Sequence, residues 1–266
     1  MKHPRMGSMI ASFTAACDSA SRWRPRLMIV YYHTLPESRL DAFRAQLDAL
    51  VALAKPIAAL AGDERQPAWP CVAVTIDDGF VSTIQRALPN LMARNIPVTL
   101  FVPAGLLGCK PGWPPGGEFD AQDEMIISGD ELRVLAREPL VTIASHGMNH
   151  ADFARLEERE ARYQLAASKA LLEHVTERPV NGFSFPYGSA RASHVSWAHD
   201  AGYTHVFGTN PSPAGNGHHG LIGRVRVDPW DPLPEFERKL RGAYRWLGYA
   251  SGIKQRIQQA LEPVHA

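Results

Sequence analysis

The chain has 266 residues, and its 28 lysines and arginines nearly balance its 27 aspartates and glutamates, giving a formal charge of +1. A hydrophobic share of 45% excludes wholesale disorder, and the near-neutral charge argues against a protein that binds nucleic acid by electrostatic attraction. No apolar run approaches the roughly 20 residues that span a bilayer. The three cysteines (Cys17, Cys71 and Cys109) are too few and too widely spaced for a disulfide framework or a zinc knuckle.

Residues 1–26 are interpreted as an N-terminal leader, frayed or helical. The stretch 9–17 is mildly apolar and resembles a weak secretory signal, but Ser12 and Thr14 dilute it and Asp18 ends it. We therefore predict a cytoplasmic protein.

From Leu27 onward, short apolar runs alternate with longer segments of helical periodicity, and this repetition predicts a parallel α/β sheet, either a barrel or a doubly wound sheet. No Gly-x-Gly-x-x-Gly motif supports a dinucleotide-binding fold. The expected strands are 27–32, 71–76, 97–102, 140–144, 181–185, 203–207 and 221–227. The expected helices are 39–54, 82–94, 128–136, 154–175, 190–201 and 233–247.

Polar residues gather directly behind the expected strands. In a parallel barrel the carboxyl ends of the strands converge on one face, where active sites are built. Adjacent carboxylates behind an apolar strand are costly unless something, such as a metal ion, neutralises one of them. The residues in such positions are His33, Asp77, Asp78, His146, His150, Pro186, Tyr187 and Asp228.

The spacing of His146 and His150 is typical of a metal site, because residues four apart on a helical turn point the same way. With one of the two aspartates they make a three-ligand set suited to a catalytic divalent ion such as zinc. The same set occurs in non-haem iron oxygenases. The second aspartate favours hydrolysis, because activation of water needs a base and an oxygenase does not.

Two long loops rich in glycine and proline, 103–117 and 208–220, follow expected strands and are predicted to shape a binding site at the same face. The first contains Trp113, which we expect to contact substrate. The second contains His218 and His219.

Three segments resemble, in order, the motifs of the polysaccharide deacetylases, the NodB-homology family known as carbohydrate esterase family 4. Thr75–Gly79 (TIDDG) resembles its Thr-Phe-Asp-Asp-Gly motif, and Ser145–His150 (SHGMNH) is similar to its Ser-His-x-x-x-His motif. Phe183–Gly188 (FSFPYG) resembles the third motif, usually Phe-Arg-Pro-Pro-Tyr-Gly. Tyr32-His33 and the strand VTLFVP at 98–103 are similar to the branch that acts on exopolysaccharides or surface glycans.

This resemblance, which runs from about residue 27 to 227, implies a distorted (β/α)7-type barrel and metal-dependent hydrolysis of an N-acetyl group on a sugar. It implies that Asp78, His146 and His150 hold the metal and that Asp77 is the general base. The backbone N–H of Tyr187 would contribute to the oxyanion hole, where a lost donor typically costs about 3 kcal/mol. Together with Trp113, the motif residues Pro186 and Tyr187 are expected to contact the substrate.

The chain departs from the family pattern at two points. Ser184 stands where the family often has an arginine that orients the base, and Arg224 or Arg226 on the last expected strand is a candidate substitute. The family's C-terminal Leu-x-x-His motif, which supplies the general acid, is absent from 221–229. An acid must still protonate the leaving amine, and His33 is our first candidate, ahead of His218 and His219.

The expected organisation is a leader (1–26), a single barrel domain (27–229) and a C-terminal amphipathic helical segment (230–266) packed on the barrel. That last segment carries an apolar stripe among basic residues, so peripheral contact with an anionic membrane is a second interpretation. The stripe consists of Phe236, Leu240, Ala243, Tyr244 and Leu247. The expected substrate is an acetylated amino-sugar glycan or glycolipid, with zinc as cofactor and no nucleic acid. The alternatives are a catalytically impaired glycan-binding relative and a metal-dependent amidohydrolase acting on another small amide.

Overall fold

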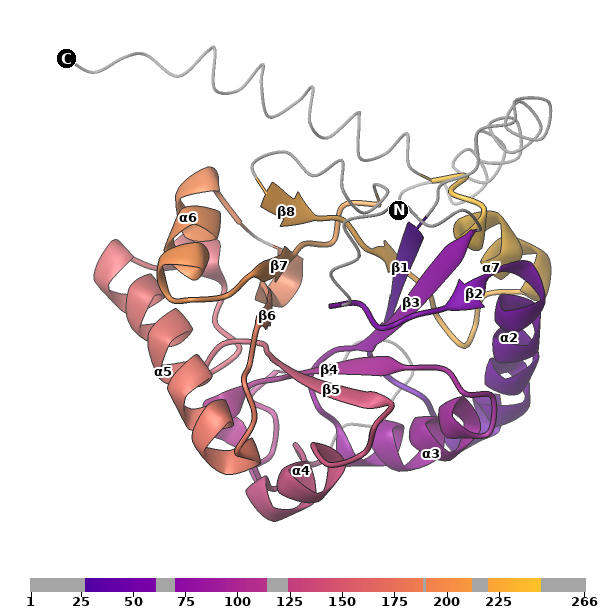
Figure 1. The fold of residues 1–266 in the computed structure, drawn as a ribbon, viewed down its shortest axis with the longest axis horizontal. Helices are drawn as coiled ribbons and strands as arrows, with labels where there is room; N and C mark the ends of the chain where they lie inside the picture. The colour runs from indigo at the N-terminus through magenta and orange to yellow at the C-terminus, as the bar shows by residue number, and fades with distance from the viewer. Residues whose placement is uncertain (1–26, 61–69, 114–123, 189, 212–219, 245–266) are drawn as a thin grey trace, which may run out of the picture.

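A computed structural model describes residues 27–60, 70–113, 124–188, 190–211 and 220–244. The strands form one curled sheet in which every pairing between strands is parallel, and the helices lie around its outer side (Figure 1). The strands are β1 (Leu27–Tyr32), β2 (Lys55–Pro56), β3 (Cys71–Ile76), β4 (Val98–Val102), β5 (Val141–Ser145), β6 (Gly182–Ser184), β7 (His205–Phe207), β8 (Leu221–Ile222) and β9 (Val225–Arg226). The α-helices are α2 (Leu40–Leu53), α3 (Val81–Met92), α4 (Gly129–Leu135), α5 (Glu158–Thr176), α6 (Ala192–Asp200) and α7 (Leu233–Leu240).

The two ends of the sheet are joined by one short segment of chain. The strand order is β8-β7-β6-β5-β4-β3-β1-β9, with β2 pairing beside β3. β8 pairs with β7 and β9 pairs with β1, and only Gly223 and Arg224 lie between β8 and β9. If β8 and β9 are counted as one interrupted strand, the ring has seven strand positions, and the prediction of a distorted (β/α)7-type barrel is confirmed.

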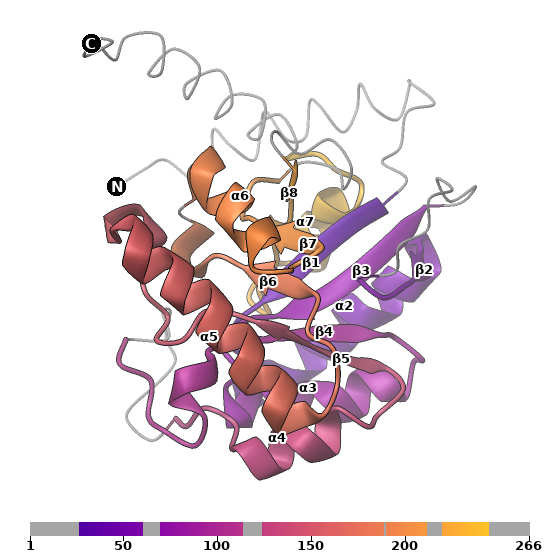
Figure 2. The same ribbon diagram turned by 60° about the vertical axis from the view of Figure 1, so that its left-hand side comes forward.

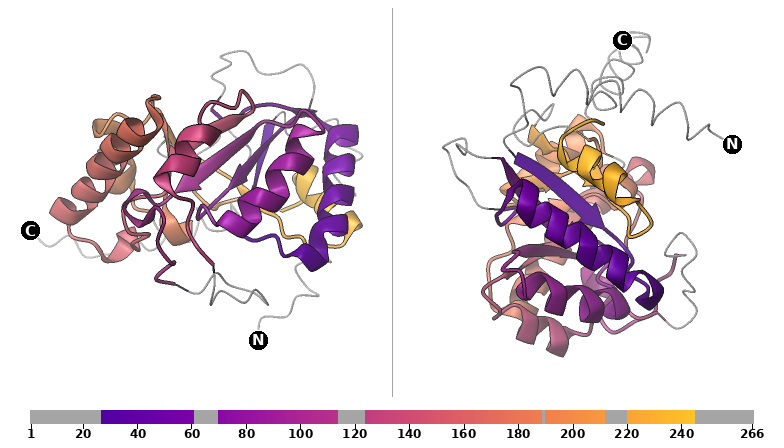
Figure 3. Two further views of the ribbon diagram at one scale, coloured as in Figure 1. Left: turned by 90° about the horizontal axis from the view of Figure 1, so that it is seen from below. Right: turned by 90° about the vertical axis from the view of Figure 1, so that its right-hand side faces the viewer.

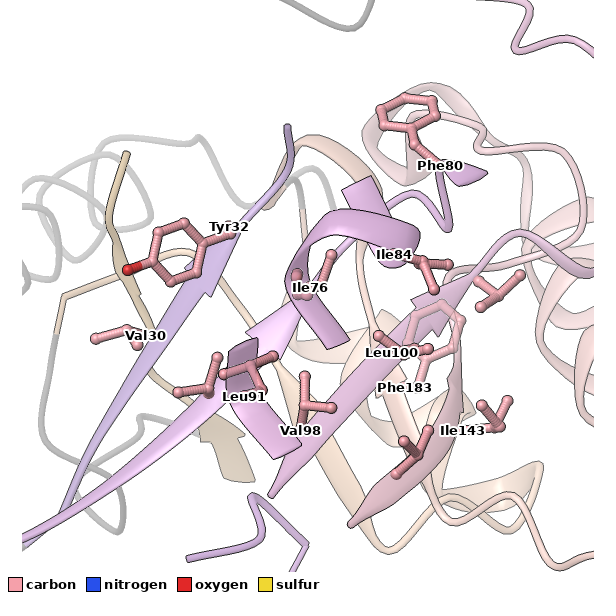
Figure 4. Packing of buried hydrophobic residues seen from close by; sticks show 14 of the residues in the cluster. Val30, Tyr32, Ile76, Phe80, Ile84, Leu91, Val98, Leu100, Ile143 and Phe183 are labelled. Carbon is pink, nitrogen blue, oxygen red and sulfur yellow. The ribbon is translucent and has the colours of Figure 1, made fainter. Parts of the chain in front are cut away.

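The strands are buried on both faces, as their nearly continuous apolar sequences predict. All six residues of β3 are buried, because helices cover the outer face of the sheet and the opposite face closes on itself. Neighbouring residues on one strand point to opposite faces. Leu100 therefore belongs to the large cluster between sheet and helices (Figure 4), whereas Phe101 packs in a smaller cluster with Ala144 and Phe207.

The helices differ from the expected ranges mainly at their ends. α5 begins at Glu158 and not at residue 154, because Phe153–Arg155 forms a separate 3-10 turn capped by the Asp152 side chain. α4 begins at Gly129 behind a capping box made by Ser128 and Glu131. Figure 2 brings α5 and α6 to the front of the barrel.

The last described helix, α7, lies beside α2 (Figure 3, right). Phe236 and Leu240, two members of the apolar stripe, are buried there. The leader and the chain beyond Tyr244, including Leu247 of that stripe, lie outside the described residues. Within the described ranges, no helix combines the length and the apolar character that crossing a membrane requires.

Candidate active site

The carboxyl ends of β1, β3, β5 and β6 bring the predicted site residues together. Asp78, His146 and His150 are buried, and each offers a potential ligand atom within 4.8 Å of those of the other two. Asp77 directly precedes Asp78 and is buried as well. His218 and His219, our second candidates for the general acid, lie outside the described residues.

The backbone at these strand ends adopts conformations that side chains usually avoid. Asp78 has a φ of 71°, His150 of 53° and Tyr187 of 59°, all in the left-handed region. Such conformations cost energy for residues other than glycine and persist where the surrounding structure enforces them, which is often at functional sites. Asp78 lies two residues beyond the end of β3, Tyr187 three beyond β6 and His150 five beyond β5.

His146 is set up as a neutral ligand. Burial lowers its pKa to about 4, so that the imidazole is uncharged at neutral pH. Its Nδ1–H donates to the Ser184 carbonyl oxygen at 2.7 Å, which fixes the tautomer and leaves a lone pair on Nε2. That Nε2 lies 3.5 Å from Oδ1 of Asp78.

The Asp78 carboxylate is the least satisfied group of the site. Its Oδ1 is buried and accepts no well-oriented hydrogen bond, although His150 Nε2 lies only 3.1 Å away. Burial raises the pKa of Asp78, but contact with His150 and the positive charges that His33 and His146 carry when protonated lower it below its usual value, so the group is ionised at neutral pH. A buried anionic oxygen that faces the lone pair of a neutral imidazole lacks a cation, and two imidazole nitrogens with one carboxylate oxygen suit a divalent transition metal.

Asp77 is neutralised in a different way, by an arginine. Nη1 and Nη2 of Arg224 donate to Oδ1 and Oδ2 of Asp77 at 2.7 and 2.8 Å, a bidentate ion pair with both side chains buried. Burial raises the pKa of Asp77, but the Arg224 guanidinium, together with His146 and His33 when they are protonated, more than offsets this and lowers the pKa to about 2. The two adjacent aspartates are therefore distinct: one has an arginine partner, and the other is directed at two imidazoles.

Arg224 uses all five of its N–H donors. Besides the two bonds to Asp77, it donates to Thr75 Oγ1 at 3.0 Å, to the Gly208 carbonyl at 3.3 Å and to Ser184 Oγ at 2.6 Å. The bond to Ser184 matters, because this serine stands where the family often has its arginine. Arg226, the other candidate, is exposed and pairs with Asp228 at 3.5 Å.

Two polar side chains accept hydrogen bonds from the backbone of the loop that carries His146 and His150, and neither was predicted from the sequence to have this role. Oε1 of Gln164 on α5 accepts hydrogen bonds from the backbone N–H groups of Met148 and Asn149 at 2.9 and 3.2 Å. Ser145 Oγ accepts from the N–H of Gly147 at 3.1 Å. Gln164 belongs to no motif, so only its polar character on a buried helix face signals a role.

The remaining predicted residues border the triad. His33 is half-buried directly after β1, close enough to Asp77 and Asp78 to interact electrostatically with both. Pro186 is buried, whereas Tyr187 is exposed and turns the edge of its ring towards His150, with centroids 4.8 Å apart. Trp113 lies flat against the other side of the site, stacked on His150.

Comparison with known proteins agrees with this geometry. A family model for polysaccharide deacetylases matches residues 64–206, more than half of the chain. YxkH of Bacillus subtilis (strain 168), a relative that carries the polysaccharide deacetylase name, is 24% identical over 168 residues. The match covers 62% of this chain and 54% of YxkH, so the chain spans about half the length of that relative.

Solved structures share the fold at low sequence identity. IcaB from Ammonifex degensii aligns with a TM-score of 0.66 at 24% identity, covering 82% of this chain and 97% of that one. The deacetylase PplD of Streptococcus pyogenes, in complex with acetate, aligns with a TM-score of 0.66 at 17% identity, covering 80% and 97%. From the family match over more than half of its length, we conclude that this chain belongs to the polysaccharide deacetylase family.

Proposed function

We propose that this protein is a metal-dependent hydrolase that removes N-acetyl groups from an amino-sugar glycan or glycolipid. The observation that carries the proposal is the buried Oδ1 of Asp78, which accepts no hydrogen bond yet lies within 3.5 Å of two imidazole nitrogens. PplD and YxkH both carry the name deacetylase, and the exopolysaccharide branch is our choice for this chain.

Asp78, His146 and His150 would hold the ion, for which zinc is our expectation. When bound, a divalent ion at such a site polarises the substrate carbonyl and lowers the pKa of water. The three ligands leave positions open for water and substrate, which distinguishes a catalytic site from a structural one.

Asp77 is the proposed general base. Arg224 keeps it ionised at neutral pH, and each of its oxygens keeps a second lone pair when it accepts from the guanidinium. Asp77 would take a proton from the attacking water, and the oxygen of that water would form the new bond to the acetyl carbon. The Tyr187 backbone N–H would donate to the oxyanion that develops on the carbonyl oxygen.

The C–N bond breaks readily only when the leaving nitrogen is protonated, so an acid is required. His33 is the proposed donor, because it lies near both aspartates at the mouth and imidazole exchanges protons near neutral pH. The products would be acetate and a free amino sugar. Pro186, Tyr187 and Trp113 are the proposed substrate contacts.

The test is acetate release from a panel of N-acetylated amino-sugar oligomers by the full chain, with and without a chelator and after zinc is restored. We expect release that the chelator abolishes and zinc recovers, and release by the Asp77→Asn variant that is slower by about 100-fold or more. Binding of a glycan without release under every metal would identify a catalytically impaired relative. Release from small non-sugar amides alone would identify an amidohydrolase of another specificity.

A further inference from the structure

The two histidines of the triad are held in different ways. His146 donates its Nδ1–H to the Ser184 carbonyl oxygen at 2.7 Å. Nδ1 of His150 is buried and, among the described residues, has no hydrogen-bond partner. Ligand histidines usually have such a partner, because the second hydrogen bond sets the tautomer and the orientation of the ring. His150 therefore needs another source of orientation.

Aromatic rings enclose His150 instead. The Trp113 ring lies parallel to the imidazole, with centroids 3.8 Å apart and an angle of 12° between the planes. The Tyr187 ring meets the imidazole edge-on at 4.8 Å, and the His146 ring does so at 5.0 Å. A close parallel contact on one face together with edge contacts leaves the imidazole little freedom to rotate or tilt.

The loop that carries Trp113 is fastened to the loop that carries His150. The backbone N–H groups of Ala104 and Gly105 donate to the carbonyls of Gly147 and Met148 at 2.8 and 2.9 Å. A Cβ at Gly105 would lie 2.8 Å from Asn149 Oδ1 and 3.0 Å from the Met148 carbonyl oxygen, so the two loops approach more closely than a larger residue allows. The two chain segments thus meet both at their backbones and at their ring systems.

The Trp113 indole is positioned by ring contacts and not by a hydrogen bond from its Nε1–H. Trp113 Nε1 is buried and, within the part of the chain that the structure describes, makes no hydrogen bond. Besides His150, its ring packs against Phe80, with centroids 6.3 Å apart. A buried N–H without an acceptor is unfavourable, so the stacking contacts must outweigh that cost for the indole to stay in place.

We propose that Trp113 is a positioning residue for His150: its indole face does for this ligand what the Ser184 carbonyl does for His146. The inference rests on the proposed function, because it takes His150 to be a metal ligand. It gives Trp113 a role beyond substrate contact. Aromatic pairs contribute enough to change an equilibrium roughly threefold to tenfold, and loss of the partner of a ligand histidine typically weakens metal binding by about 10–100-fold.

The experiment compares the full-length wild type with Trp113→Leu, Trp113→Phe and Trp197→Phe. Trp197 is the matched control, because it also contacts a histidine (His194, centroids 5.2 Å apart) but that pair lies on α6, away from the triad. Zinc affinity is measured by competition with a chromophoric chelator, and the Co²⁺-loaded proteins are compared by visible absorption. We expect Trp113→Leu to weaken zinc binding about tenfold and to alter the Co²⁺ spectrum, Trp113→Phe to recover most of both, and Trp197→Phe to match the wild type.

Intrinsic fluorescence provides a second measurement that does not depend on the stability of the leucine variant. Co²⁺ should quench tryptophan emission in the wild type and in Trp197→Phe, and should quench it much less in Trp113→Phe. Equal quenching in all three proteins, or unchanged affinity and spectrum in Trp113→Leu, would overturn the inference.

A wild type that binds neither zinc nor Co²⁺, or a His146→Ala variant that binds them normally, would instead overturn the proposed metal site. Apo-protein melting temperatures of the tryptophan variants close to that of the wild type would show that any change in affinity arises at the site and not from unfolding.

Discussion

Replacement of Arg224 by methionine tests most directly whether this arginine alone neutralises Asp77, in contrast to Asp78, which faces two imidazoles. The substitution keeps a long side chain in the barrel but removes five hydrogen bonds and the positive charge that faces Asp77. Breaking a buried ion pair by removing one partner typically costs about 3–5 kcal/mol, because the other charge remains buried and unpaired. That is a large part of the roughly 5–15 kcal/mol that stabilises an ordinary domain.

The pKa of Asp77 gives a second, smaller figure. It falls from 3.8 to about 2 in the folded protein, which corresponds to roughly 2 kcal/mol of stability at neutral pH, at about 1.4 kcal/mol per pH unit. Because the folded pKa is lowered, this contribution is present above about pH 4 and is lost as the pH falls towards 2. The difference between wild type and Arg224→Met should therefore narrow over that interval.

Urea denaturation at pH 7 and at several values between 4 and 2 would measure both effects. The matched control is Arg226→Met, two residues along the chain, where an exposed ion pair at 3.5 Å should contribute less than about 1 kcal/mol. The double variant Arg224→Met, Asp77→Asn should be more stable than the sum of the single changes predicts, because it leaves no buried charge unpaired. Equal costs for the two arginine variants, or strict additivity in the double variant, would refute the reasoning.

Four further outcomes are expected. Elemental analysis should find about one equivalent of zinc in the reconstituted wild type and none in His146→Ala, and full occupancy in the variant would remove this residue from the ligand set. Asp77→Asn should keep its zinc while turnover falls by about 100-fold or more, so that joint loss of metal and activity would show Asp77 to be a ligand. His33→Ala should retain metal and fold but lose the basic limb of a bell-shaped rate–pH profile, and an unchanged limb would place the acid elsewhere. Gly188→Ala should destabilise the protein by more than about 1 kcal/mol in urea, because φ is 68° and the added Cβ would overlap Thr209 Oγ1; Gly112→Ala, with no atom within 4 Å, is its control.

Most of the barrel could be predicted because its strands carry a strong and simple signal. Continuous apolar runs such as CVAVTI are costly anywhere except between two covered faces, and all seven strand positions fall within a few residues of the expected ranges. The predicted start of α5 at residue 154 was wrong, because the sequence of the Asp152-capped turn and that of the helix that follows it both resemble the start of a helix. Local sequence signals do not distinguish a single isolated turn from the first turn of a longer helix.

The sequence predicts those site residues that directly follow an expected strand. It does not identify the partner of Asp77 beyond two candidates, Arg224 and Arg226. In an uninterrupted strand, residues two apart point to the same face, so the sequence offers no means of choosing. The break between β8 and β9 determines which arginine pairs with Asp77, because it places Arg224 in the buried interior and leaves Arg226 exposed. Gln164 could not be predicted at all, because its role depends on the packing of α5 against the histidine loop.

The segment 221–226 supplies β8, which pairs with β7, and β9, which pairs with β1, and this arrangement has a consequence for synthesis on the ribosome. Asp77 leaves the exit tunnel 147 residues before Arg224, the residue that neutralises it, and β1 waits even longer for its neighbour β9, because the paired residues Val30 and Val225 are 195 positions apart. A nascent chain that stops short of residue 221 keeps a buried carboxylate without a counter-ion and two open sheet edges, which invite pairing with other chains. The segment that carries β8 and β9 thus closes the barrel and supplies the counter-ion of Asp77 in a single event, so we expect a product truncated before residue 221 to be prone to aggregate.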